Sequence, residues 1–338
     1  MKAVRYLGPG QPFRMEDVPD PEPGPGQVSI RIGAAGMCHT ELHFESGLLD
    51  LGVAPVTMGH EIAGVVEDVG EGVDPSRRGE RVVVHYYAGC GRCEWCRRGL
   101  ENLCGELRAE YGFLSDGGYA EHITVPAANA VTLPAGVELT EAAPIGCGVT
   151  TAVHASSIAQ VGEGDAVVVY GVGTVGFGLI QVCRLQGARV IGIGRSRRKL
   201  ELAQELGAEV IDASAVPDVA AVVRDATGGR GADVVFELVA TAPTMDATVT
   251  MLAKRGRLVF IGYSEDPFTV HPIRLVISET VVTASVGNTL AELEEAVGLV
   301  ASGAVRTVVD RTLPLERWPE GMEALRRGDA VGRIVLVP

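Results

Sequence analysis

Runs of apolar residues alternate with helix-like apolar spacing through the second half of the chain. An apolar run at 166–170 precedes the sequence GVGTVG, a helical apolar pattern continues to about Gly187, and a second run follows at 189–193. The segments ADVVFELV, GRLVFIGY and TVVTASVG add three more runs, with helical patterns between them. Continuous apolar runs are typical of strands buried on both faces, so this alternation predicts a doubly wound parallel sheet.

The glycine-rich turn after the first of these strands predicts a nucleotide site. Gly171, Gly173 and Gly176 stand between a strand and a helix, which is the context that a dinucleotide-binding turn requires. The glycines allow a tight turn, close approach of a pyrophosphate and close packing of helix on strand. The helix N-terminus, with Thr174 and Val175, offers its free N–H groups to the phosphates.

The end of the second strand selects between nicotinamide cofactors. A carboxylate expected there accepts hydrogen bonds from the adenosine ribose of NAD, but this chain has Gly194 followed by the basic segment 195–199, RSRRK. Loss of the acid removes repulsion against a 2′-phosphate, which guanidinium groups bind well. We therefore expect NADP(H) in preference to NAD(H), held by Arg195, Ser196 and Arg197. The alternative is a solvated first turn of the next helix.

Composition narrows the class of protein. With 338 residues and 46% hydrophobic content, the chain is long enough for two domains. Its formal net charge of −14 argues against a nucleic-acid partner. No apolar run reaches the roughly 18 residues of a membrane span, and the N-terminus lacks a signal-peptide core. We expect a cytoplasmic protein, in which closely spaced cysteines are metal ligands or catalysts more often than disulfides.

Four of the seven cysteines lie in one short segment, CGRCEWCRRGLENLC, at residues 90–104. Four thiolates complete the tetrahedral shell of a zinc ion and leave no position open to substrate, so we expect a structural zinc site. Ferredoxin-type iron–sulfur runs have a shorter last gap and a proline after the fourth cysteine, whereas Gly105 follows here. Four unligated thiols are the remaining alternative.

A second set of metal donors is spread over three segments. Cys38 lies in AAGMCHTELHFESG, His60 in VTMGHEIAGVVEDVG and Cys147 in APIGCGVTTAVHA. Each is a weak signal alone, because a lone cysteine or histidine is usually a packed core residue. Together they are two thiolates and one imidazole, the ligand set of a catalytic zinc with an open fourth position.

The order of these motifs resembles the zinc-dependent medium-chain alcohol dehydrogenases, over nearly the whole length from MKAVRY to GRIVLVP. The resemblance implies an α/β two-domain fold, with a β-rich GroES-like catalytic domain from residues 1–150 and 289–338 and a Rossmann NADP-binding domain at 151–288. It implies a structural-zinc lobe at about 88–106. It also implies two zinc ions per chain, a structural one on Cys90, Cys93, Cys96 and Cys104 and a catalytic one on Cys38, His60 and Cys147.

The resemblance also implies roles for single residues. Thr40 is expected to touch the substrate oxygen and His43 to end a proton relay. Glu61 corresponds to a carboxylate near the catalytic zinc, either a transient ligand or a salt-bridge partner. His39 and Arg333 are expected to assist at the cofactor pyrophosphate.

The resemblance implies a role for Glu41 as well, which stands where the family usually has Asp to hydrogen-bond the zinc histidine, and one more methylene should still reach. Val239, Ile261 and Val286 end later strands of the predicted sheet, where we expect nicotinamide neighbours, although each also suits a strand core.

These expectations combine into one function. The protein is expected to be an NADP-preferring, zinc-dependent alcohol dehydrogenase or carbonyl reductase for alcohols and their aldehydes or ketones, with aromatic and medium-chain substrates as hypotheses. Similarity to short microbial members implies a homotetramer. Two alternatives stay open: a zinc-free alkene or quinone reductase of the same fold, and a non-catalytic NADP-binding protein.

Overall fold

The computed structural model describes residues 1–338, which form two compact units. The first contains residues 1–150 and 288–338, and the second contains residues 151–287. The chain leaves the first unit after Thr150 and returns at Asn288, one residue before the position expected from the sequence. Each unit has its own sheet and its own core.

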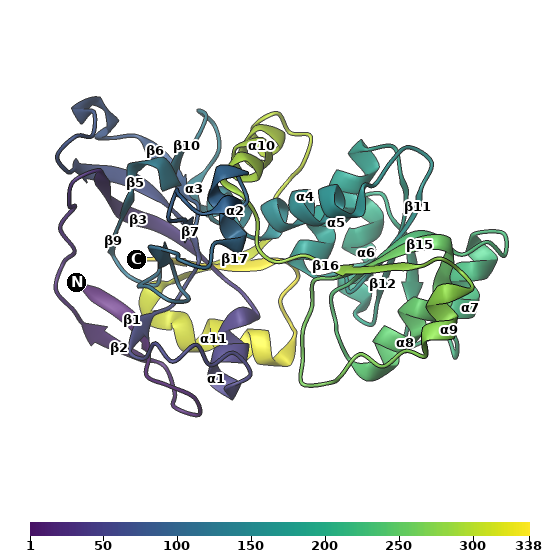
Figure 1. Cartoon of the computed structure of the whole chain (residues 1–338). Coiled ribbons are helices and arrows are strands. Elements are labelled where there is room, and N and C mark those ends of the chain that lie inside the picture. Colours follow the sequence, from purple (N-terminus) through teal and green to yellow (C-terminus); the bar gives the residue numbers. More distant parts are fainter. The chain divides into compact units, whose positions relative to one another are not determined.

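A six-stranded parallel sheet forms the second unit, with strand order β13-β12-β11-β14-β15-β16 (Figure 1). Its strands are β11 (Ala166–Tyr170), β12 (Arg189–Gly194), β13 (Glu209–Asp212), β14 (Ala232–Glu237), β15 (Leu252–Phe260) and β16 (Val281–Ala284). Its helices are α4 (Gly148–Ala159, which begins in the first unit), α5 (Thr174–Leu185), α6 (Arg197–Glu205), α7 (Val219–Ala226), α8 (Ala242–Met251) and α9 (Pro272–Val276).

The strand order explains why this sheet is doubly wound. The chain moves outward from β11 through β12 to β13, returns to the centre at β14, and then moves the other way to β16. Because crossovers between parallel strands are right-handed, this reversal puts the helices of the two halves on opposite faces. Every residue of β11 is buried, so its continuous apolar run reflects burial on both faces. The predicted parallel sheet is confirmed.

The first unit is rich in antiparallel strands. Its seven-stranded sheet has the order β10-β6-β5-β3-β18-β17, with β9 also pairing with β3. These strands are β3 (Gln27–Met37), β5 (Glu61–Val69), β6 (Arg81–Val84), β9 (His122–Pro126), β10 (Ala130–Thr132), β17 (Val309–Pro314) and β18 (Arg333–Val337). Since β18 pairs with β3, the C-terminal segment completes a sheet that the N-terminal half begins.

Smaller elements surround this sheet. The remaining strands are β1 (Lys2–Tyr6), β2 (Arg14–Asp17), β4 (Val56–Thr57), β7 (Tyr87–Ala88) and β8 (Ala109–Glu110). The α-helices are α1 (Thr40–Ser46), α2 (Glu94–Arg97), α3 (Leu139–Ala142), α10 (Leu290–Ala301) and α11 (Trp318–Arg327). Short 3₁₀ turns are η1 (Pro75–Arg77), η2 (Glu101–Leu103), η3 (Ala127–Asn129), η4 (Ala143–Gly146) and η5 (Leu315–Arg317).

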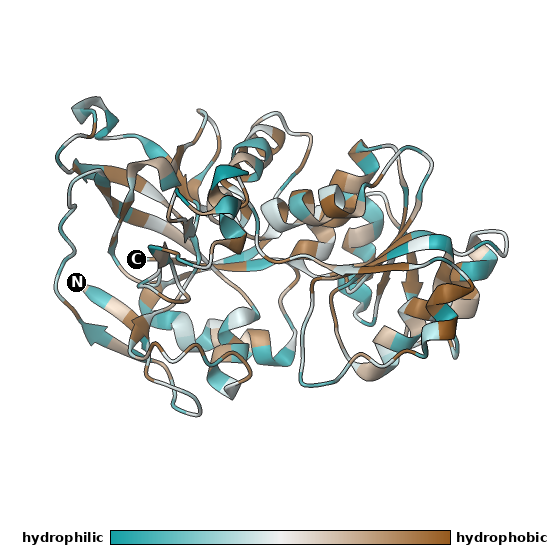
Figure 2. Cartoon of the chain, in the orientation of Figure 1, coloured by the Kyte–Doolittle hydropathy of each residue, from teal (hydrophilic) through white to brown (hydrophobic).

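One surface of the second unit is unusually apolar. On α9 and just after it, Ile273, Val276 and Ile277 are 57%, 71% and 69% exposed, and Val281 on the edge strand β16 is 52% exposed. Figure 2 shows α9 in the apolar colour. Clusters of exposed apolar side chains of this kind mark contact surfaces. No helix of the structure is both long enough and apolar enough to cross a membrane.

Two leucines test the core of the parallel sheet. Leu258 on β15 is fully buried, whereas Leu185 at the end of α5 is 54% exposed. Leu258→Ala should lower the free energy of unfolding by about 2–5 kcal/mol, because it leaves a cavity. Leu185→Ala should change it by less than about 0.5 kcal/mol. Urea denaturation followed by circular dichroism measures both, and equal losses would contradict the observed burial.

Candidate metal centres and nucleotide site

Four potential metal ligands converge at one end of the first unit's sheet. The donor atoms of Cys38, His60, Glu61 and Cys147 all lie within 4.8 Å of one another. Cys38 directly follows β3, His60 and Glu61 stand at the start of β5, and Cys147 directly follows η4. The pairing of Gly36 on β3 with Glu61 on β5 brings the first three residues together.

Gly36 is required by this arrangement. A Cβ atom at Gly36 would lie 1.9 Å from Oε2 of Glu61. Any larger residue would therefore push the Glu61 carboxyl out of the cluster. The glycine in the segment AAGMC makes room for a buried carboxyl on the neighbouring strand.

Burial and mutual contact shift the titration of these groups. The contact between the two thiols lowers the pKa of Cys38 well below its usual value and raises that of Cys147. Burial alone would lower the pKa of His60, but the Cys38 thiolate and nearby carboxylates raise it to about 9. Burial raises the pKa of Glu61 to about 7. The cluster therefore gathers several buried electron-pair donors, and a bound cation would stabilise their deprotonated forms.

The donor set fits a zinc ion. Sulfur and imidazole nitrogen are the ligands that zinc prefers, and the Nδ1 atom of His60 is buried without a hydrogen-bond partner. With Cys38 and Cys147 as thiolates, the set matches a catalytic zinc site of three protein ligands with a further position open.

Arg333 lies beside this cluster and forms an ion pair with Glu61. Its side chain is 5% exposed, its Nη2 atom is 2.5 Å from Oε1 of Glu61, and its Nη1 atom donates to the carbonyl of Met37 at 2.9 Å. The guanidinium neutralises a buried carboxylate, so the charge of Glu61 is compensated by an ion pair. The expected contact of Arg333 with the cofactor pyrophosphate stays a prediction.

Helix α1 carries the hydroxyl and imidazole expected to move protons. Thr40 begins the helix, and its hydroxyl donates to the sulfur of Cys38 at 3.5 Å. His43 lies one turn further along, where burial lowers its pKa. His39 is the exposed N-cap residue. The hydroxyl therefore lies beside the metal-ligand cluster, and His43 stays neutral at neutral pH.

Glu41 contacts the histidine less closely than the sequence suggests. Its Oε1 atom is 3.8 Å from Nδ1 of His60, which is too long for a hydrogen bond. Its Oε2 atom accepts the backbone N–H of Cys38 at 2.8 Å. Burial raises the pKa of Glu41 to about 8. This carboxyl thus fixes the loop that carries Cys38.

Aromatic rings cover the side of the cluster next to His60. The His60 ring lies 4.9 Å from the ring of Phe113 and 5.4 Å from that of Tyr86, measured between centroids. Tyr86 packs in turn on Tyr87, with 4.4 Å between centroids. Sequence reasoning missed Phe113, because it lies in a loop without a distinctive pattern.

The four-cysteine segment forms a separate lobe of the first unit. The sulfur atoms of Cys90, Cys93, Cys96 and Cys104 lie within 4.8 Å of one another. Sulfur–sulfur distances are 3.9 Å for Cys90–Cys96 and 3.8 Å for Cys93–Cys104. Backbone N–H groups point at the sulfurs: those of Arg92 and Cys93 donate to Cys90 and lower its pKa to about 6. Such a closed nest of thiolates fits a structural zinc ion.

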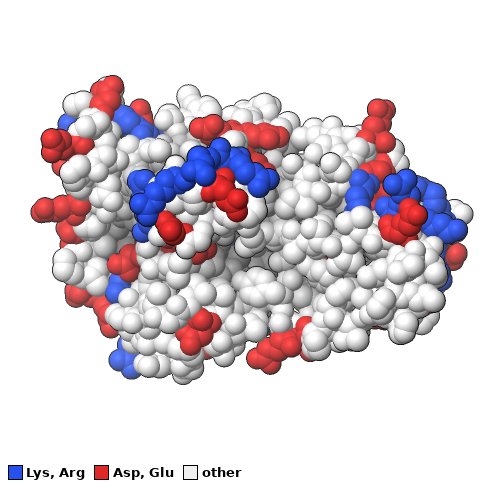
Figure 3. Space-filling view, viewed as in Figure 1, with Lys and Arg blue, Asp and Glu red and all other residues white.

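The surface of this lobe is basic although the whole chain is acidic. Exposed arginines cluster there, and Figure 3 shows a band of basic side chains over the region of α2. Arg92 is paired with Glu106 at 2.8 Å, and the guanidinium of Arg98 lies 5.0 Å from the ring centroid of Trp95.

In the second unit the glycine turn links β11 to α5. Gly171 has φ = 112°, a conformation open to glycine but strained for other residues. A Cβ at Gly176 would lie 2.4 Å from the Gly171 carbonyl oxygen, whereas a Cβ at Gly173 would meet nothing within 4 Å. Thr174 and Val175 form the first turn of α5. The turn therefore combines tight packing with an open approach to the helix N-terminus, as a pyrophosphate requires.

The basic segment after β12 begins α6. Arg195 and Arg197 are exposed, and Nε of Arg197 bonds Oε1 of Glu201 at 2.8 Å. A Cβ at Gly194 would lie 2.6 Å from Cγ2 of Val172. Packing against the glycine turn thus excludes a carboxylate side chain at residue 194 unless Val172 moves.

Val239, Ile261 and Val286 all follow carboxyl ends of parallel strands, after β14, β15 and β16. These ends lie on the same edge of the sheet as the glycine turn after β11. Sequence reasoning missed Glu237, the last residue of β14. It is fully buried and accepts hydrogen bonds from the N–H groups of Val239 at 3.0 Å and Ala240 at 2.6 Å.

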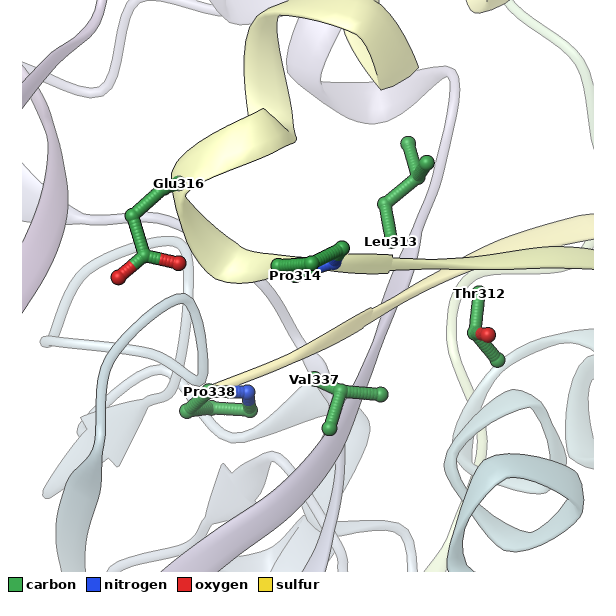
Figure 4. A pocket seen from close by; sticks show the side chains of 6 residues that line it. All are labelled: Thr312, Leu313, Pro314, Glu316, Val337 and Pro338. Atoms are coloured by element: carbon green, nitrogen blue, oxygen red, sulfur yellow. The ribbon is translucent and has the colours of Figure 1, made fainter.

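A surface hollow of about 470 Å³ lies at the C-terminal end of the chain (Figure 4). Its lining consists of Thr312, Leu313, Pro314, Glu316, Val337 and Pro338. None of these residues belongs to either metal-ligand cluster.

Comparison with known proteins identifies the family. Residues 24–135 match the alcohol dehydrogenase GroES-like domain, and residues 174–302 match the zinc-binding dehydrogenase family. The chain is 34% identical to the NAD-dependent alcohol dehydrogenase of Sulfurisphaera tokodaii and 31% identical to the acryloyl-coenzyme A reductase of the same organism, with 100% of each chain covered. The alcohol dehydrogenase structure from Aeropyrum pernix superposes with a TM-score of 0.94, at 34% identity and 100% coverage of both chains.

The chain belongs to the zinc-dependent medium-chain alcohol dehydrogenase family. The predicted combination of a GroES-like domain with a Rossmann-like parallel sheet is thereby confirmed. Family membership explains why donors from three distant segments, at residues 38, 60–61 and 147, meet in one place. The pairing of Glu61 with Arg333 could not be read from the sequence, because 272 residues separate the two partners.

Metal content tests both clusters. Purified protein should contain two zinc ions per chain, as measured by inductively coupled plasma mass spectrometry. His60→Ala and Cys93→Ser should each reduce the content to one, because each removes a ligand from a different cluster. Cys183→Ala is the matched control, since Cys183 is buried in α5 and belongs to neither cluster, and this variant should retain two zinc ions. Loss of zinc in the control, or none in the variants, would refute the assignment.

Proposed function

We propose that this protein is a zinc-dependent alcohol dehydrogenase that transfers hydride between a nicotinamide cofactor and an alcohol or the corresponding aldehyde or ketone. The observation that carries the proposal is the donor cluster at Cys38, His60, Glu61 and Cys147, with the Thr40 hydroxyl 3.5 Å from the Cys38 sulfur. An open zinc site beside a hydroxyl suits an alcohol substrate. The relatives named as alcohol dehydrogenases support the same activity.

The residues of the chain have distinct tasks in this reaction. Cys38, His60 and Cys147 would hold a zinc ion, which would act as a Lewis acid and lower the pKa of a bound alcohol. The Thr40 hydroxyl accepts the alcohol proton at its oxygen and donates its own onward. His43 is the proton acceptor nearer to solvent, and burial keeps it neutral and able to accept at neutral pH.

Other residues prepare the site. The Arg333 guanidinium holds the Glu61 carboxylate beside the cluster, and the Glu41 carboxyl holds the Cys38 loop. The rings of Tyr86 and Phe113 cover the cluster next to His60 and exclude water there. A wall of this kind favours substrates with an aromatic or medium-length apolar body.

The pH dependence of His43 variants tests the proton transfer. His43→Gln should lower the rate of alcohol oxidation at pH 7 on the order of 100-fold, because the final proton acceptor is lost. The loss should shrink toward pH 9, where hydroxide accepts the proton directly. In the wild type the rate should fall as the pH drops below the lowered pKa of His43, since the protonated ring accepts nothing. A loss independent of pH would contradict the relay.

Within the nicotinamide cofactors we propose a preference for NADP(H). Support comes from the missing carboxylate at Gly194 and the exposed Arg195 and Arg197 that follow. A relative is named NAD-dependent, so the arginines of this chain carry the proposal. The 2′-phosphate would replace Glu201 as the partner of Arg197.

Initial rates decide the cofactor. With benzaldehyde and equal subsaturating cofactor, reduction with NADPH should exceed that with NADH. Arg195→Ala should reduce kcat/KM for NADPH by about tenfold to 100-fold, the value of a charge-assisted hydrogen bond, and leave NADH unchanged. Arg98→Ala, in the four-cysteine lobe, also removes one positive charge, and it should leave kcat/KM for both cofactors unchanged. Faster turnover with NADH would retain the dehydrogenase and make the basic segment a solvated helix start.

A zinc-free alkene reductase is the second candidate. It is favoured by the acryloyl-coenzyme A reductase among the relatives. The metal content and the activity of His60→Ala distinguish the two, because reduction of an activated alkene needs no zinc ligands. The complete donor set makes the zinc enzyme the better-supported proposal.

We further propose that the enzyme works in the reducing cytoplasm, where its seven cysteines remain thiols. A homotetramer is proposed as well. It is supported by the exposed apolar side chains of α9, which a second copy would cover.

A further inference from the structure

The segment by which the chain re-enters the first unit is held by three contacts. Asn288 is its first residue and is fully buried, and the preceding Gly287 has φ = 56°. The Asn288 amide donates to the carbonyl of Gly146 at 3.4 Å. The two other contacts come from His85 and Glu101. We call residues 288–290 the return segment.

Glu101 binds the start of helix α10. Its Oε1 atom accepts the backbone N–H of Leu290, the first residue of that helix. The first N–H groups of a helix have no acceptor within the helix, so Glu101 satisfies a donor that would otherwise be unpaired. A carboxylate at a helix N-terminus also interacts favourably with the helix dipole.

His85 lies between two carbonyl oxygens. Its Nδ1 atom is 3.1 Å from the oxygen of Tyr87, and its Nε2 atom is 3.2 Å from that of Asn288. The ring is buried, and Glu101 Oε1 lies 3.9 Å from Nδ1. The His85 ring therefore connects strand β7, through Tyr87, to the return segment, through Asn288.

Glu101 belongs to the four-cysteine lobe. It begins η2, between Cys96 and Cys104, and the N–H of Cys104 donates to its carbonyl at 3.0 Å. A Cβ at Gly89 would lie 2.8 Å from the sulfur of Cys96 and 2.9 Å from Cβ of Glu101, so the lobe backbone packs closely against both. The position of the Glu101 carboxyl is therefore set by the same loop that presents the cysteines.

We propose that the four-cysteine lobe positions the return segment, with Glu101 and His85 as positioning residues. The lobe then does more than stabilise its own fold, because it also fixes where the chain re-enters the first unit from the nucleotide-binding unit. Its expected effect on cofactor binding rests on the function proposed above, whereas its effect on the return segment does not.

Hydrogen exchange at the return segment tests the proposal. Glu101→Ala should speed exchange of the Leu290 amide by about tenfold or more, because its acceptor is lost. Glu101→Gln keeps an acceptor oxygen and should exchange like the wild type. Glu106→Ala is the matched control, since Glu106 lies in the same lobe but pairs only with the exposed Arg92 in this network. Peptides covering residues 287–293, analysed by mass spectrometry, give the rates.

The outcomes separate positioning from general stability. Faster exchange confined to the return segment in Glu101→Ala, with zinc content unchanged, supports the proposal. Unchanged exchange overturns it, and so does faster exchange throughout the chain. In steady-state kinetics, Glu101→Ala should raise KM for the nicotinamide cofactor several-fold and leave kcat nearly unchanged. An equal fall in kcat would overturn the link to cofactor binding. Absence of turnover in the wild type would count against the proposed function, while the exchange result would still decide the contact.

A ligand variant tests the role of the lobe itself. Cys104→Ser should remove one zinc ion per chain and speed exchange of the Leu290 amide as Glu101→Ala does. The double variant should show no further increase, because both changes act through one contact. Additive increases would overturn the coupling. If Cys104→Ser does not fold by circular dichroism, the Glu101 series decides alone.

Discussion

The first unit is organised around the need to compensate buried charge. Its core contains two carboxyl groups, Glu41 and Glu61, at 0% exposure, together with His60 and Arg333 at 1% and 4%. Removing a charged group from water is costly unless an opposite charge or hydrogen bonds replace the solvent. Arg333 neutralises Glu61, and burial favours the uncharged form of Glu41, which accepts the Cys38 N–H, so a metal cation would compensate mainly the two cysteine thiolates. The strand pairing that brings these groups together is therefore also what makes their burial tolerable.

This constraint explains the architecture around the cluster. β18 pairs with β3 at the point where β3 ends, and it carries Arg333 to the Glu61 side of the sheet. The C-terminal strand therefore completes the electrostatics of a site whose ligands all lie in the first 147 residues. Gly36 leaves space for the carboxyl between them. The pairing of β18 with β3 thus both completes the sheet and supplies the cation that compensates Glu61.

Features signalled by a short stretch of sequence could be predicted, whereas contacts between residues far apart in the sequence could not. The strands around GVGTVG were predictable because buried parallel strands and a glycine turn are signalled within about 30 residues. The four cysteines were predictable from their spacing. By contrast, the ion pair between Arg333 and Glu61 could not be predicted, because nothing local to VGRIVLVP indicates that Glu61 lies opposite Arg333. The contact between Glu101 and Leu290 spans 189 residues and likewise leaves no periodic signal. The expected hydrogen bond from Glu41 to His60 is not formed, because the longer Glu41 side chain accepts the backbone N–H of Cys38 instead.

The cofactor turn illustrates how packing and recognition constrain the same residue. Gly194 lacks a carboxylate, but a Cβ there would also collide with Val172, the second residue of the glycine turn. An acid at residue 194 therefore requires the side chain of Val172, which is 4% exposed, to move or to be smaller. A shift of the proposed NADP(H) preference toward NAD is therefore expected to involve both positions. Gly194→Asp alone would strain the glycine turn that we expect to bind the pyrophosphate, whereas Gly194→Asp with Val172→Ala would relieve the collision and leave the carboxylate free to face a ribose.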